Sequence, residues 1–187
     1  EIESIKNVFK KHIDVTNIDI FINVCELLVP EKDKKINGAF FTPQVITEFI
    51  TSNTIKSASD RICDPSCGCG AFLITAAIFI SNKYDKNIVD VIEQNIYGVD
   101  ISEYSVRRAK IILTLLALKK GFDVPKIKFN IITADSLKIN WGAVFPKIKS
   151  GFEVVLGNPP YVKFQDMQIT QRKDLNKYWE TLKNGNY

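Results

Sequence analysis

Short apolar runs alternate with longer stretches of helical periodicity through the middle of the chain. Four runs have the length and side-chain content of buried strands, and they cover residues 61–64, 95–100, 128–134 and 152–157. Residues 71–81 and 103–120 carry apolar side chains at helical spacing, with Ser102 suited to cap the second helix and Gly121 to end it. Strands alternating with helices predict an α/β fold with a parallel sheet.

The amino-terminal part of the chain adds further helices to this pattern. Residues 1–30 have apolar positions at helical spacing, and Pro30 with the charged stretch after it marks a loop. We therefore expect a helical segment over residues 1–35 that packs on a main body formed by residues 36–187. Another helix should start at Thr42 and Pro43, because Thr is a good N-cap and Pro suits the first helical position.

Composition and charge narrow the function only slightly. The 187 residues are 45% hydrophobic and 25% charged, and no apolar run approaches the ~20 residues of a membrane span. Without a signal peptide pattern, we expect a cytoplasmic protein that does not bind a membrane. The single Met is Met167, which suggests a fragment or a processed chain. A net charge of +4 is compatible with nucleic acid but does not establish it.

The cysteines do not form a recognisable metal site. Cys63, Cys67 and Cys69 follow a C-x3-C-x-C spacing that lacks the paired cysteines of zinc ribbons, and the only histidine is His12. We expect reduced thiols and no bound metal.

Polar residues follow every predicted strand. Ligands of open α/β sheets bind where the carboxyl ends of parallel strands meet, so these residues are expected at one site. They are Asp64 with its glycine-bearing turn, Asp100, Asp135 and Asn158. The turn lacks the third glycine of the dinucleotide fingerprint, and Asp100 comes 30 positions after Gly70 instead of about 20. A nucleoside without a pyrophosphate therefore fits better than a dinucleotide.

The last strand ends in a stiff turn, Asn158-Pro159-Pro160-Tyr161. The two prolines cannot donate ladder hydrogen bonds, and each forces an extended conformation on the residue before it. The turn brings an amide, a free carbonyl and an aromatic ring together, a combination suited to a planar molecule with an amino group.

These motifs together resemble those of the S-adenosylmethionine-dependent adenine-N6 DNA methyltransferases of restriction–modification and phage-defence systems. The resemblance spans residues 36 to 164 and rests on five segments in the family's order. They are Gly38–Pro43 (an F-x-T-P-like segment), Asp64–Leu73 (D-P-x-x-G-x-G-x-F/L), Tyr97–Ile101, Ala134–Leu137 and Asn158–Tyr161 (N-P-P-Y).

The resemblance implies a fold, a cofactor and residue roles. The fold would be the Rossmann-like class I methyltransferase sheet, and the cofactor S-adenosyl-L-methionine. The implied cofactor-binding residues are Ala39, Phe40, Phe41, Thr42, Pro43, Asp64, Ser66, Cys67, Gly68, Gly70, Asp100 and Asp135. Asn158, Pro159 and Tyr161 are the implied catalytic residues, and with Pro160 they would bind an adenine flipped out of double-stranded DNA.

Later strands and a target-recognition domain expected of the family are absent from the sequence, so we expect an incomplete sheet and a piece inactive alone. A specificity or nuclease region or subunit is expected elsewhere. Two alternatives stay open. One is a protein-glutamine or RNA N-methyltransferase, which would use the same kind of turn for another nitrogen. The other is a non-catalytic fragment that only holds cofactor or DNA.

Overall fold

The computed structural model describes residues 42–122, 127–148 and 150–161. The expectations for residues 1–35, for residues 39–41 and for the segment after Tyr161 fall outside these ranges. In chain order the elements are α4 (Gln44–Thr54), β1 (Ile62–Asp64), α5 (Ala71–Lys83), α6 (Ile88–Gln94), β2 (Ile96–Asp100), α7 (Glu103–Lys119), β3 (Asn130–Thr133), α8 (Trp141–Val144) and β4 (Val154–Val155).

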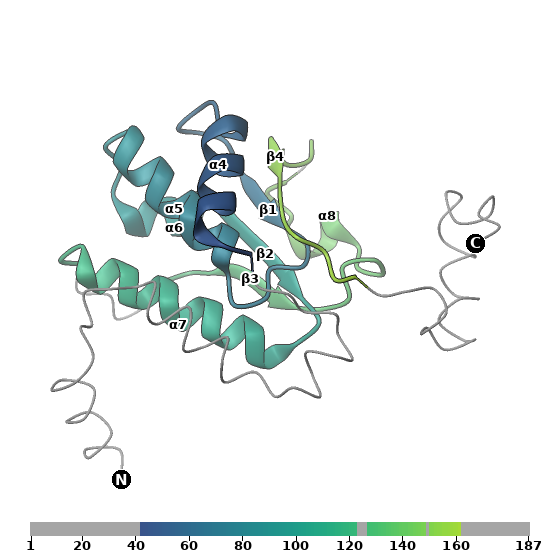
Figure 1. Ribbon diagram of the computed structural model, residues 1–187. Helices are drawn as coiled ribbons and strands as arrows, with labels where there is room; N and C mark the ends of the chain where they lie inside the picture. The colour runs from purple at the N-terminus through teal and green to yellow at the C-terminus, as the bar shows by residue number, and fades with distance from the viewer. Residues whose placement is uncertain (1–41, 123–126, 149, 162–187) are drawn as a thin grey trace, which may run out of the picture.

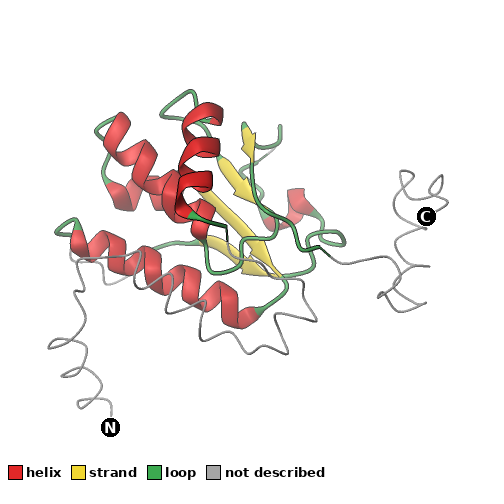
Figure 2. Ribbon diagram, viewed as in Figure 1, coloured by secondary structure: helices red, strands yellow, loops and turns green. Residues whose placement is uncertain are grey.

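The strands form one parallel sheet in the order β3-β2-β1-β4 (Figure 2). Ile62 of β1 is paired with Ile96 of β2 on one side and with Val154 of β4 on the other. All three pairings are parallel, so the four strands end at the same edge. The predicted α/β fold, with its four strands in this orientation, is confirmed.

Helices cover the sheet on both faces (Figure 1). Helices α5, α6 and α7 pack on one face, where Leu73, Ile112 and Ile131 belong to a large buried aliphatic core. On the other face a smaller aromatic cluster forms around Tyr97, whose ring meets that of Phe145 edge-on at 5.4 Å. The core thus fixes β1 and β2 from both sides.

The ends of α7 follow the sequence signals. The Ser102 side chain accepts a hydrogen bond from the Ser105 N–H at 3.3 Å. Gly121 has a φ of +84°, and the next residue, Phe122, donates its N–H back to the Ala117 carbonyl at 3.1 Å. The predicted start at Glu103 is confirmed, and the helix ends at Lys119, one residue before the predicted end, with the Ncap hydroxyl and the left-handed glycine satisfying backbone groups that the helix leaves unpaired.

The expected start of α4 is wrong by one residue. Pro43 is the N-cap, with a ψ of 142°, and no side chain caps the helix. The Pro43 carbonyl accepts from the Ile46 N–H at 2.9 Å, so the helix begins at Gln44. Thr42 does not act as a cap, since its hydroxyl accepts a hydrogen bond from the Asn158 side chain instead.

Two short helices have no counterpart among the predictions. Asn87 caps α6 by accepting from the Val89 N–H at 2.8 Å, and Asn140 caps α8 by accepting from the Ala143 N–H at 3.1 Å. With seven and four residues, they are too short to show helical periodicity. None of the helices in the described ranges combines the length and apolarity that crossing a bilayer requires.

Candidate functional site at the carboxyl ends of the strands

A compact turn joins the end of β1 to α5. The Cys67 N–H donates to the Val99 carbonyl of β2 at 3.0 Å, which fastens the turn to the neighbouring strand. Gly68 and Gly70 have φ values of +52° and +91°, a left-handed conformation that glycine adopts without strain. A Cβ on Gly70 would also lie 3.0 Å from the Ala109 Cβ of α7. The predicted glycines therefore shape the turn and let it pack on a helix.

Asp100, at the end of β2, holds this turn in place. One carboxylate oxygen accepts from the Gly68 N–H at 2.7 Å, and the other accepts from the Ser102 N–H at 2.8 Å. Burial raises the pKa of Asp100, and the two backbone N–H groups oppose that rise. Each carboxylate oxygen has two lone pairs, so each keeps capacity for one more hydrogen bond.

Asp64 lies deeper, at the end of the central strand β1, and is only 2% exposed. Its Oδ1 accepts from the Ser66 N–H at 2.9 Å. Burial raises the pKa of the Asp64 carboxyl to about 7, and the nearby Asp100 charge raises it further against the Ser66 hydrogen bond. Burial thus makes both carboxyls at this edge harder to ionise.

The segment after β4 crosses directly over Asp64. The Leu156 N–H donates to the Cys63 carbonyl at 3.0 Å, which continues the pairing with β1. A Cβ on Gly157 would lie 2.6 Å from Asp64 Oδ1. Only glycine fits there, so Gly157 sets how closely the following Asn158 turn approaches the sheet. Sequence reasoning placed Gly157 in the strand and gave it no role in the site.

Asn158 is held by the residue that precedes α4. Its amide nitrogen donates to the Thr42 hydroxyl at 3.2 Å, across 116 positions of sequence. Thr42 is 9% exposed, while Pro159 and Pro160 are exposed and Tyr161 is 70% exposed. This hydrogen bond therefore joins the Gly38–Pro43 motif, through its described residue Thr42, to the Asn158–Tyr161 motif.

Asp135 is farther from the turn than the other predicted acids. It follows β3, which is separated from β4 by β2 and β1. Its carboxylate accepts from the Leu137 N–H at 3.1 Å and pairs with the Lys138 ammonium at 3.4 Å. These contacts close a local turn, and a cofactor-binding role for Asp135 stays a prediction.

The cysteines near the site are buried and poorly ionised. Burial raises the pKa of the Cys63 thiol to about 12 and that of Cys67 well above its usual value. Cys67 Sγ would lie 3.1 Å from a Cβ on Gly98, so it packs against β2. In residues 42–122, 127–148 and 150–161, histidine, cysteine and acidic side chains form no cluster of three that could hold a metal ion.

Comparisons with known proteins agree with the predicted resemblance. The family described as N-6 DNA Methylase matches residues 16–186. The methylase subunit of type I restriction enzyme MpnII from Mycoplasma pneumoniae is 32% identical over 155 residues, which are 78% of this chain and 26% of that protein. The EcoEI methylase subunit from Escherichia coli is 27% identical over 126 residues, 66% of this chain and 24% of that protein.

A solved modification subunit of a putative type I restriction enzyme from Vibrio vulnificus YJ016 has 19% identity and a TM-score of 0.48. The aligned region covers 66% of this chain and 25% of the chain in that structure. The chain thus spans about a quarter of the length of the curated relatives it matches. With the family match running over nearly all of its residues, the chain belongs to the N-6 DNA methylase family.

Proposed function

We propose that this chain is part of an enzyme that transfers a methyl group from S-adenosyl-L-methionine to N6 of a flipped adenine in DNA. The observation that carries the proposal is the joining of four motifs, in two pairs, at one end of the sheet. Asp100 holds the glycine turn, and Thr42 holds Asn158. The family match adds the reaction class, and the restriction–modification setting follows from the names of the relatives.

The residues at the strand ends fit the proposed cofactor. Asp100 keeps acceptor capacity on both oxygens, as the two hydroxyls of a ribose require. A Cβ on Gly68 would meet no atom within 4 Å, so the turn leaves open space at that point. When bound, S-adenosylmethionine supplies a positively charged sulfonium with a transferable methyl group. A positive charge beside Asp64 and Asp100 would favour their ionised forms and so oppose the rise in pKa that burial causes.

Asn158 and Pro159 would activate the amine of adenine. That amine is a weak nucleophile because its lone pair is delocalised into the ring. The Asn158 amide nitrogen is already engaged with Thr42, which leaves its side-chain oxygen to accept from the substrate. The Pro159 carbonyl would accept the second amine hydrogen. Both acceptors would localise the lone pair on the amine nitrogen. The gain in reaction rate comes from positioning and electrostatics.

Tyr161 would stack on the flipped base. Its side chain is 70% exposed and follows two prolines that restrict the backbone. Extruding a base from a duplex costs a few kcal/mol, part of which an aromatic partner returns. In this proposal the partner is double-stranded DNA and the protein acts in the cytoplasm. The DNA sequence is recognised by a part of the protein outside this chain.

The test separates chemistry from cofactor binding. In the intact protein, Asn158→Ala should lower the transfer of tritiated methyl groups to DNA by at least about 10²-fold. Calorimetric affinity for S-adenosylmethionine should change by less than about threefold, because Asn158 contacts Thr42 and not the Asp100 turn. Asn53→Ala, an exposed position on α4, is the matched control. Unchanged turnover in Asn158→Ala would refute the assigned role.

The acceptor is tested in the same assay. Label should appear on DNA, in adenine, and not on RNA or on a release-factor protein offered in parallel. We also propose that residues 1–187 alone give no site-specific methylation, since the aligned part of this chain covers only about a quarter of each of these relatives. Robust site-specific activity from this piece would contradict that part.

A further inference from the structure

Helix α4 packs with its polar side toward the protein. Thr47 and Thr51 are 1% and 0% exposed, whereas Val45 and Phe49 are 75% and 69% exposed. The Thr47 hydroxyl lies 2.9 Å from the Thr75 hydroxyl of α5, so the two helices meet through small polar side chains. A surface helix normally buries its apolar stripe. The inverted arrangement indicates that another element covers the outer side of α4.

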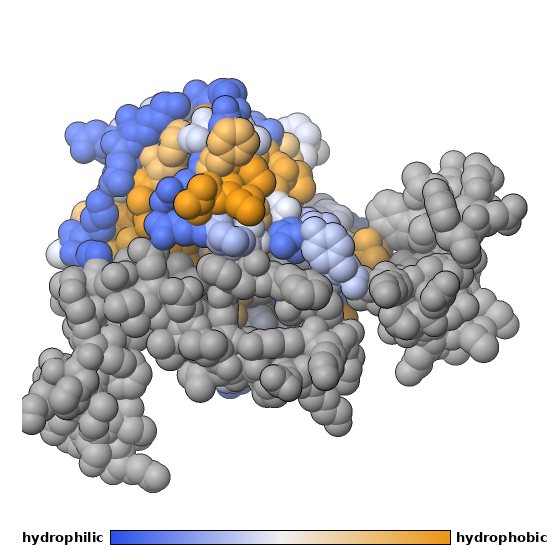
Figure 3. Space-filling model, viewed as in Figure 1, coloured by the Kyte–Doolittle hydropathy of each residue, from blue (hydrophilic) through white to orange (hydrophobic). Residues whose placement is uncertain are grey.

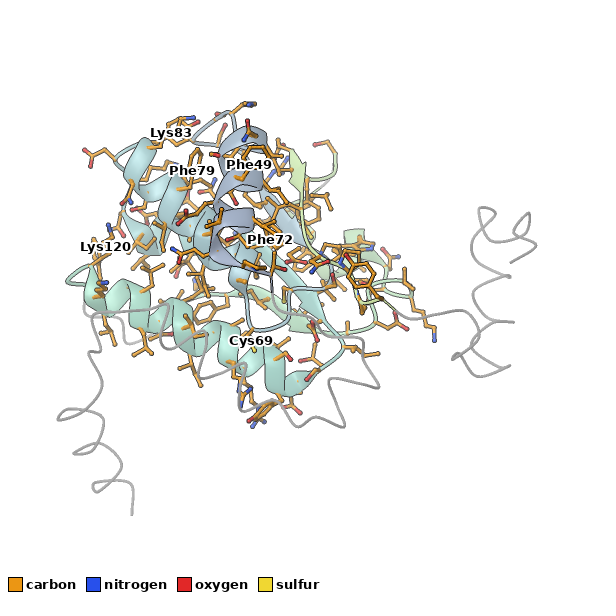
Figure 4. The ribbon with its side chains drawn as sticks, viewed as in Figure 1. Phe49, Cys69, Phe72, Phe79, Lys83 and Lys120 are labelled. Carbon is orange, nitrogen blue, oxygen red and sulfur yellow. The ribbon has the colours of Figure 1, made fainter. Side chains whose placement is uncertain are left out.

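A groove runs between α4 and α5 beside this exposed stripe. Its volume is about 840 Å³. Phe49, Ile78 and Phe79 line it, and Lys83 stands at its rim with the ammonium 4.9 Å from the centre of the Phe79 ring. Figure 4 shows Phe49, Phe79 and Lys83 at the same end of the two helices. Figure 3 shows an apolar patch over α4 with hydrophilic residues around it.

We propose that residues 16–29 of this same chain dock into the α4/α5 groove as an apolar helix. Nine of these fourteen residues are apolar, including Ile20, Phe21, Val24, Leu27 and Leu28 at helical spacing. A helix that is apolar on nearly all sides is stable only when it is covered. A helix over residues 16–29 would therefore cover the exposed stripe of α4 and bury its own apolar side chains there.

The connection between them favours this occupant over another molecule. The groove is lined by Thr42 and Pro43, where the described chain begins. Residues 30–41 join the two, and twelve residues reach at most about 40 Å. Helix α4 has eleven residues and is only about 16 Å long, so the chain can fold back along it. A tethered segment also acts at an effective concentration in the millimolar range.

Hydrogen–deuterium exchange in the intact protein tests the proposal. Peptides covering residues 16–30 and 44–54 should be protected in the unaltered protein. The double variant Val45→Asp/Phe49→Asp should speed exchange of the 16–30 peptide by at least about tenfold. Ile111→Asp is the matched control, because Ile111 is 56% exposed on α7 and should leave both peptides unchanged. A peptide covering β2 reports whether each variant is folded.

The reciprocal variant Phe21→Asp/Leu28→Asp should speed exchange of the 44–54 peptide to a similar degree. The proposal is overturned if residues 16–30 exchange as an unstructured peptide in the unaltered protein, or if their protection survives Val45→Asp/Phe49→Asp. Protection that rises with protein concentration would assign the groove to a second copy. Protection of residues 44–54 alone would assign it to another part of the longer protein.

Discussion

Replacing Gly157 by alanine tests whether close approach of the Asn158 turn to the sheet matters for catalysis. The φ of Gly157 is outside the left-handed region, so alanine causes no backbone strain there. The obstacle is contact, because the new Cβ would lie 2.6 Å from Asp64 Oδ1 and 3.1 Å from Asp64 Cγ. Asp64 is buried and bonded to the Ser66 N–H, so it has little room to yield.

The size of the effect follows from the displacement. Ordinary contact starts at 3.4 Å, so the turn must move by about 0.8 Å. A shift of about 1 Å in a positioning group can lower the rate about 10²-fold, equivalent to about 2.7 kcal/mol of activation free energy. We expect Gly157→Ala to lower kcat by that order, with little change in affinity for S-adenosylmethionine. Asp100 and the Gly68 turn lie on the other side of β1 from β4.

The assay is methyl transfer from tritiated cofactor to unmethylated DNA at saturating cofactor, in the intact protein. Gly142→Ala is the matched control, since its nearest neighbour would be Asn140 Oδ1 at 3.7 Å. The background variant Asp64→Ala removes the obstructing atoms, so adding Gly157→Ala there should lower kcat by less than about threefold. A kcat for Gly157→Ala within twofold of the unaltered enzyme, or an equal loss in both backgrounds, would refute the reasoning.

Two further predictions use the partners of Asn158 and Asp64. Thr42→Val removes the hydroxyl that fixes the Asn158 amide, so kcat should fall roughly fivefold, equivalent to about 1 kcal/mol of activation free energy. Thr42→Ser keeps a hydroxyl and should keep the kcat of the unaltered enzyme. Equal kcat values for the unaltered enzyme and both variants in steady-state kinetics would show that Thr42 has no such role. The pKa of Asp64 rises from 3.8 to about 7 on folding, so the native state binds the proton more tightly and stability falls as pH rises through this window. The free energy of unfolding of Asp64→Asn, relative to that of the unaltered protein, should therefore rise by an amount on the order of 3 kcal/mol from pH 4 to pH 7.5, as measured by urea unfolding. A difference that does not change with pH would contradict the assigned pKa.

The fold could be predicted from the sequence to the extent that each element carried its own signal. The centres of all four strands were found, but their ends were placed too far out: residues 152–157 reduce to Val154–Val155. The extra residues continue along the sheet without full pairing, because beyond Leu156 the chain turns over Asp64. Local propensity cannot report that turn, since its cause is a carboxylate on another strand.

Burial was harder to predict than secondary structure. Helical spacing puts Val45, Ile46, Phe49 and Ile50 on one stripe of α4 without showing which way the stripe faces; the first three are exposed, and only Ile50 packs partly on the core. The structure turns Thr47 and Thr51 inward, where the Thr47 hydroxyl lies 2.9 Å from the Thr75 hydroxyl of α5, while the buried Thr51 hydroxyl has no hydrogen-bond partner among the described residues. Periodicity identifies a face, but the neighbouring helix decides what that face meets.

The site illustrates why motif order alone is informative yet incomplete. Asp64, Asp100, Asp135 and Asn158 were predicted to share an edge because parallel strands end together, and the strand pairing puts the ends of all four strands at one edge. The hydrogen bond between Thr42 and Asn158 could not be predicted, since Thr42 had a local interpretation as a helix cap that satisfied every sequence rule. A threonine before a proline can serve either its own helix or a distant side chain. Here Pro43 takes the capping position, which frees the Thr42 hydroxyl for Asn158 and links the start of α4 to the candidate catalytic turn.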